Sequence, residues 1–166
     1  MSSPPARPAS LLPAAARGAV AGLLGVAAMT AAEKLEQSMT HRPNSYVPGR
    51  TLQTLVGKRP DDGDRPMVWN HAMHWGTGAL LGALRGIWAA TGMRGPRADA
   101  AHTVVRLSFD QTMENMSGCG APPHTWPVKE QMWDSLHKAV YSFTTGVLAD
   151  RMVPAQLESH RGTTSH

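Results

Sequence analysis

Cysteine is almost absent from this chain of 166 residues, which contains Cys119 alone. A single thiol cannot form a disulfide within the chain, so no disulfide framework holds the fold. One thiol is compatible with both a cytoplasmic and a membrane location. Cys119 could act as a nucleophile with His124 or His137 as its base, but a lone cysteine in a turn more often has no chemical role.

Charged and aromatic residues are also scarce. Charged residues make up 17% of the chain, against roughly 25% in a typical soluble domain. The net charge of +4 could suggest a nucleic acid or an anionic lipid as partner. The basic residues are scattered, however, and the pair Lys58-Arg59 is offset by Asp61, Asp62 and Asp64. With no helix-turn-helix or zinc-finger spacing either, we expect no nucleic-acid partner.

The chain also lacks a long uninterrupted hydrophobic run. The longest lies within 18–32 and has 15 residues, short of the roughly 20 that span a bilayer. Small residues recur four apart in two segments, at Gly18 and Gly22 and at Gly78, Gly82 and Gly86. Glycine costs a helix roughly 1 kcal/mol in water and is common where helices pack tightly in a membrane. We therefore favour membrane embedding.

Two alternatives to membrane embedding remain open. A soluble helical bundle in the cytoplasm explains the charges in the helices more easily and the glycines less easily. A signal peptide would explain Arg17 followed by the apolar segment, although the leader is long and has no clean cleavage motif. The lysines and arginines at the two ends of the helices are evenly divided, so they do not orient the chain in a membrane.

The apolar segments and the breakers between them predict one all-α domain, a four-helix up-down bundle, over residues 14–153. Its helices are expected at about 14–39, 67–91, 98–116 and 128–152. Residues 1–13 and 154–166, rich in small and polar residues, are expected to be flexible tails. The segment 40–66 is a long loop with four prolines and three glycines, and a short helix is possible at about 51–56.

Each predicted helix carries one pair of acidic or histidine residues three or four positions apart, which places both on one face. The pairs are Glu33 and Glu36, His71 and His74, Asp110 and Glu114, and Asp134 and His137. If the helices alternate in direction, as short connections favour, all four pairs lie at the same end of the bundle. The sequence thus predicts a polar pocket there, beneath the 40–66 and 118–127 loops.

This pocket suggests two kinds of chemistry. Carboxylate and imidazole ligands resemble, loosely, the metal sites of ferritin-like bundles and suit divalent iron, manganese or zinc. The candidate ligands of such a metal are Glu33, His71, His74, Glu114 and His137. Buried carboxylates and imidazoles can also act as acids and bases, and the candidate catalytic residues are His74, Asp110, Glu114, Asp134 and His137.

Each polar pair also has a purely structural interpretation. The two glutamates could be a solvated helix end, and the histidines of 67–91 could be interfacial or hydrogen-bonded in the core. Asp110 and Glu114 could form ion pairs with Arg106 and Arg85, since burial requires such partners. In the last helix, Asp134 could pair with Lys138.

Three stretches carry a resemblance: "AGLLGVAAMTAAEKLEQ", "RPNSYVPGRTL" and "DQTMENMSGCGAPPHTWPVKEQMWDSLHKAVYSFTTGVLADR". They resemble a group of small uncharacterised helical proteins of bacteria and fungi that are predicted to lie in membranes. The resemblance covers about 18–151 and implies no established activity and no catalytic residue. Because fungal members can lie in biosynthetic clusters, it also implies an accessory role if the gene neighbourhood agrees.

Three functions follow as expectations. The first is a small membrane protein without enzymatic activity, whose polar pocket is structural or binds a small ligand. The second is a metal-dependent or acid/base enzyme that acts on an apolar small molecule entering between the helices. The third is a soluble helical module that binds a partner.

Overall fold

The structure, a computed structural model, describes residues 11–155, and all the regular structure in that range is helical. The elements are α1 (Leu12–Thr40), α2 (Val47–Leu55), α3 (Met67–Ala90), α4 (Gly95–Met116), the short 3₁₀ helix η1 (Pro123–Thr125) and α5 (Val128–Met152). The predicted all-α class is confirmed. The long helices begin and end within three residues of the predicted bounds.

The predicted tails and loop differ from the structure in detail. Most of the two tails, 1–10 and 156–166, lies outside the described residues, and α1 already begins at Leu12. The 40–66 segment contains α2, which begins four residues before the short helix considered from sequence.

Proline marks the beginning of every α-helix. Pro13, Pro48 and Pro96 lie in the first two positions of α1, α2 and α4. Pro66 and Pro127 directly precede α3 and α5, and no N-cap side chain forms a hydrogen bond in any of the five helices. Proline fits these positions because the first N–H groups of a helix have no partner within it, and its fixed φ favours the first turn.

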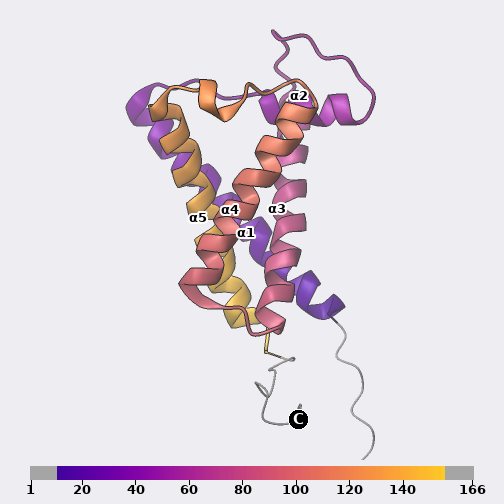
Figure 1. The fold of residues 1–166 in the computed structure, drawn as a ribbon, viewed down its shortest axis with the longest axis vertical. Helices are drawn as coiled ribbons and strands as arrows, with labels where there is room; N and C mark the ends of the chain where they lie inside the picture. The colour runs from indigo at the N-terminus through magenta and orange to yellow at the C-terminus, as the bar shows by residue number, and fades with distance from the viewer. Residues whose placement is uncertain (1–10, 156–166) are drawn as a thin grey trace, which may run out of the picture.

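The four long helices run along the long axis of the molecule in alternating directions (Figure 1). The beginning of α1, the α3–α4 turn and the end of α5 lie together at one end, which we name the terminal end. The opposite end, the loop end, carries α2, η1 and the segments around them. α1 packs mainly on α3 and α5, and α5 packs also on α4.

Glycines bring the backbones of α1 and α3 into direct contact. A Cβ atom added to Gly82 would lie 2.6 Å from the Cα of Gly22, and one added to Gly18 would lie 2.6 Å from the Cα of Gly86. Gly22 likewise faces the backbone of Gly78. Such close approach of backbones through small residues four apart is typical of helix pairs in membranes.

The interior is filled by small and polar side chains. The largest fully buried side chains are Arg85, Arg106, Tyr141, Met29 and His102. Many large apolar side chains lie instead on the surface, among them Val20, Leu24, Leu80, Val104, Met132, Leu136, Phe143 and Val147. This is the opposite of a water-soluble core, where charged residues are almost never fully buried and large aliphatic residues usually are.

Candidate functional site

The main candidate site is a small, partly open cavity between α2, α3, α4 and α5, which we name the central cavity. Its volume is about 20 Å³. The lining residues are Pro48 of α2, Met73, His74 and Thr77 of α3, Arg106, Asp110 and Glu114 of α4, and Lys138 of α5. Most of these side chains are polar, so the cavity is a polar enclosure within the helices.

Two cations balance the aspartates next to the central cavity. The Nε of Arg106 donates to Oδ2 of Asp110 at 2.9 Å. The ammonium of Lys138 lies 3.4 Å from the same carboxylate oxygen and 2.6 Å from Oδ1 of Asp134. Buried carboxylates require such partners, because an unpaired charge in the interior is costly. The predicted pairs of Asp110 with Arg106 and of Asp134 with Lys138 are therefore formed.

A second polar group, the loop-end cluster, joins α1 to α5. Arg42 contacts Oε2 of Glu36 at 2.9 Å and Oε2 of Glu130 at 3.3 Å. Partial burial acts to lower the pKa of the Arg42 guanidinium, but its hydrogen bonds and charge attraction to Glu36 outweigh burial and raise that pKa. Arg42 therefore remains a cation that links the end of α1 to the beginning of α5.

A third group, the terminal-end cluster, surrounds Arg85. Its guanidinium is fully buried and contacts Oδ1 of Asp99 at 2.8 Å and Oδ1 of Asp150 at 2.9 Å. Gly146 makes room for Asp99, since a Cβ atom on that glycine would lie 2.5 Å from the carboxylate carbon. One arginine thus connects α3, α4 and α5 through two acids.

The predicted polar layer is divided between these groups. Of the predicted catalytic residues, His74, Asp110 and Glu114 line the central cavity, and Asp134 reaches it through Lys138. His137 does not line it. Its ring stacks on Trp133 with centroids 6.1 Å apart, and its buried Nε2 has no hydrogen-bond partner among residues 11–155.

The predicted divalent-metal site is not formed. In the part of the chain that the structure describes, no group of three or more His, Cys, Asp or Glu residues is placed to hold a metal ion. Among its five predicted ligands, His71 is exposed and Glu33 accepts a hydrogen bond from Gln37 at 3.4 Å. His74 and Glu114 line the central cavity, but there the side chains of Arg106 and Lys138 supply the positive charge.

The thiol of Cys119 is not paired with a base in the way a nucleophile would need. Its Sγ lies 3.4 Å from the Thr54 hydroxyl, and its backbone N–H donates to the carbonyl of Glu114 at 3.2 Å. These contacts join the turn after α4 to α2. Cys119 thus contributes to the packing of the loop end.

Sequence reasoning missed the terminal-end cluster. From the sequence, Arg85 was expected to pair with Asp110 or Glu114, but its partners are Asp99 and Asp150. The alternating directions of the helices could have predicted this cluster. Arg85 lies late in α3, Asp99 early in α4 and Asp150 late in α5, so alternating helices bring them to one end.

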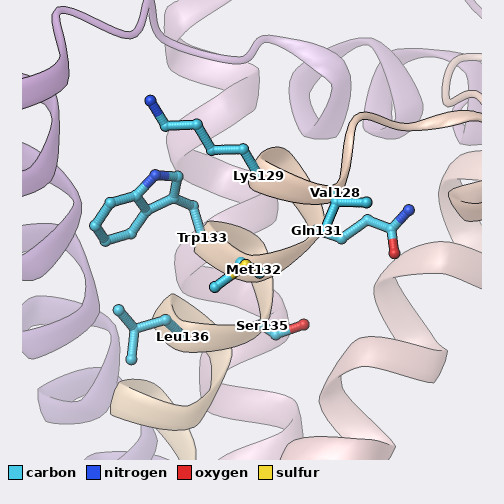
Figure 2. Close-up of a pocket in the computed structure, with 7 residues that line it drawn as sticks. All are labelled: Val128, Lys129, Gln131, Met132, Trp133, Ser135 and Leu136. Carbon is cyan, nitrogen blue, oxygen red and sulfur yellow. The ribbon is translucent and has the colours of Figure 1, made fainter.

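An open groove of about 830 Å³ follows the first turns of α5. Its lining residues all belong to that one helix and include Val128, Met132, Trp133 and Leu136 (Figure 2). Side chains around several sides of the helix contribute, with Trp133 and Gln131 pointing in different directions. A surface built by one exposed helix is part of the apolar exterior rather than an enclosed substrate site.

Within residues 11–155, α1 is the one helix long and apolar enough to cross a membrane by length and composition. This is weak evidence by itself, because the core helix of a soluble protein or a signal sequence has the same properties. The other long helices carry most of the buried charges described above. Whether α3, α4 and α5 also cross a membrane has to be judged from the side chains on their outer faces.

Comparisons of the chain with protein-family models, curated proteins and solved structures give no match. The resemblance to small helical proteins of bacteria and fungi therefore stays a prediction. The function of the central cavity has to be argued from its own geometry.

Proposed function

We propose that the chain is a small membrane-integral protein without enzymatic activity, in which α1, α3, α4 and α5 form an up-down bundle across the bilayer. Large apolar side chains face lipid, and the three polar groups lie inside. In this arrangement both ends of the described chain are on one side of the membrane, and α2 and η1 are on the other.

The observation that carries this proposal is the inverted distribution of side chains. Arg85 is 0% exposed and Arg106 is 1% exposed, whereas Val104 is 61% and Leu80 is 58% exposed. In a bilayer, charged residues face the bundle interior and pair with one another, and aliphatic side chains face outward at no cost. In water the same surface would expose apolar patches of the kind that marks a membrane or partner interface.

The helix lengths and the glycine contacts support the same proposal. Even α4, the shortest of the four bundle helices, has 22 residues. At 1.5 Å per residue it is about 33 Å long, which is enough to cross a hydrocarbon core about 30 Å thick. The α1–α3 contact uses glycines where a soluble interface would ordinarily use larger apolar side chains.

The size of the central cavity favours this function over an enzyme acting on an apolar molecule. About 20 Å³ has room for one water molecule, which needs roughly 10–15 Å³. Pockets that bind organic ligands usually measure roughly 300–1,000 Å³. The acid and base residues therefore form an internal polar network rather than an organic substrate pocket.

The proposal predicts that Val104→Arg, in the middle of α4, destabilises the protein in lipid by about 2.5–3.5 kcal/mol. In a soluble protein, replacing an exposed valine with arginine would change the free energy of unfolding by no more than about 0.5 kcal/mol. The measurement is the free energy of unfolding in bicelles or nanodiscs, together with the amount of protein in the membrane fraction.

The matched control is Val56→Arg. Val56 is 55% exposed and follows α2 at the loop end, which the proposal places outside the hydrocarbon. This variant is expected to have nearly unchanged stability. Equal, small effects at both valines would argue for a soluble protein and against membrane embedding.

A further inference from the structure

The central cavity contains one acid more than its cations balance. Arg106 and Lys138 together neutralise Asp110 and Asp134 through contacts of 2.6–3.4 Å. Glu114 also lines the cavity, but its carboxyl group takes part in none of the ion pairs or side-chain hydrogen bonds among the described residues. It is the acid whose charge is left without a partner.

A second residue of α4 that lines the central cavity, Arg106, has an unpartnered donor. Arg106 is 1% exposed, and its Nη1 has no hydrogen-bond partner within residues 11–155. Its Nε is used by Asp110, and its Cζ lies 4.8 Å from the centre of the Tyr141 ring. A buried donor and a partly buried carboxyl that line a cavity of one-water size are the polar partners that an internal water requires.

The titratable and charged groups around Glu114 belong to α3, α4 and α5, whereas α2 contributes only Pro48 to the cavity. They are His74 of α3, Asp110 and Arg106 of α4, and Lys138 and Asp134 of α5. The turn after α4 lies on its outer side, where a Cβ atom on Gly120 would come within 2.7 Å of the Glu114 Cβ. Glu114 is only partly buried, so its side chain reaches solvent as well as the central cavity.

We infer that the central cavity is a proton-binding site in which Glu114 takes up and releases a proton and one water molecule connects it to Nη1 of Arg106. On uptake, a proton from solvent bonds to a carboxylate oxygen of Glu114, whose charge changes from −1 to 0. On release, that O–H bond breaks and the proton returns to the solvent that reaches the partly exposed Glu114 side chain. The inference rests on the proposed function in that it gives the internal polar network a ligand.

The test is infrared difference spectroscopy of the full chain, purified in detergent and compared between mildly acidic and alkaline solution, so that exposed carboxyl groups stay ionised in both. The wild-type spectrum is expected to show the C=O stretch of a protonated carboxyl that appears reversibly on acidification and shifts in deuterated water. Glu114→Gln should lose this band and Glu33→Gln should keep it. The inference is overturned if the band survives in Glu114→Gln.

A second variant keeps the test decisive if the glutamine variant does not fold. Glu114→Asp retains the carboxyl group in a changed position, so the band should remain and change its frequency. An unchanged frequency would assign the band to another acid and overturn the inference. Because infrared spectra report the carboxyl whether or not the chain is in a bilayer, a failure here is distinguishable from a failure of membrane embedding in the Val104→Arg experiment.

Discussion

Replacing Gly82 with leucine is expected to prevent the chain from reaching its native fold. The backbone of α3 touches that of α1 at this residue, and even a Cβ atom would lie 2.6 Å from the Cα of Gly22. Neither helix can yield, because the obstruction is backbone rather than the end of a flexible side chain. Overpacking a tolerant core costs about 1–3 kcal/mol. Forcing α1 and α3 apart should cost more than this, which is a large part of the roughly 5–15 kcal/mol by which a folded protein is stable.

The measurements are the amount of folded protein that accumulates and its thermal unfolding, with wild type and variants compared in one detergent. The control is Gly76→Leu on the same helix, where nothing lies within 4 Å of an added Cβ atom. That variant should fold normally, since leucine is also the better helix former. A Gly82→Leu protein as stable as Gly76→Leu would show that α1 and α3 do not pack as described.

Replacing Arg85 with methionine is expected to destabilise the protein by about 3–5 kcal/mol, the usual cost of breaking a buried ion pair by removing one partner. The substitution keeps most of the side-chain volume but removes the charge between Asp99 and Asp150, which Arg85 contacts at 2.8 and 2.9 Å. Asp99 would then be buried without its cation. The readout is the free energy of unfolding from a denaturant titration.

Arg97→Met is the matched control for Arg85→Met. Arg97 is exposed in the first turn of α4 and takes part in none of the ion pairs among residues 11–155. Its removal should change stability by less than about 0.5 kcal/mol. If both arginine variants had the same stability, Arg85 would not be holding α3, α4 and α5 together.

The helices were predictable from sequence because their signals are local. A proline at or just before the first turn marks where a helix begins, and Pro127 did so for α5. The predicted start of α4 was three residues late, because Pro96 lies inside its first turn rather than before it. The glycines four apart predicted tight backbone packing, and the structure places Gly18 and Gly22 against the glycines of α3. α2 was less predictable, because a helix of nine residues contains too few turns to show a clear period.

The candidate site was predictable only in outline. The alternating helix directions correctly predicted that Asp110 and Glu114 lie near His74. This proximity depends only on the lengths of the connections and on the position of each residue along its helix.

Partners one turn away on the same helix were predicted correctly, as for Arg106 with Asp110 and Asp134 with Lys138. Partners on other helices were not fixed by position, because a long side chain can reach several neighbours. Lys138 illustrates this: it reaches from α5 to Asp110 of α4, which replaces the predicted metal ion by a cation of the chain itself.

The most direct test of membrane embedding is the environment of the Val104 position compared with that of Val56. Each valine is replaced by cysteine, Val104→Cys or Val56→Cys, in a chain carrying Cys119→Ser, and labelled with a nitroxide in nanodiscs. Collisions with oxygen, which concentrates in lipid, are compared with collisions with a water-soluble nickel chelate. If α4 crosses the bilayer, oxygen should dominate at position 104 and the nickel chelate at position 56. Dominance of the nickel chelate at both positions would contradict membrane embedding.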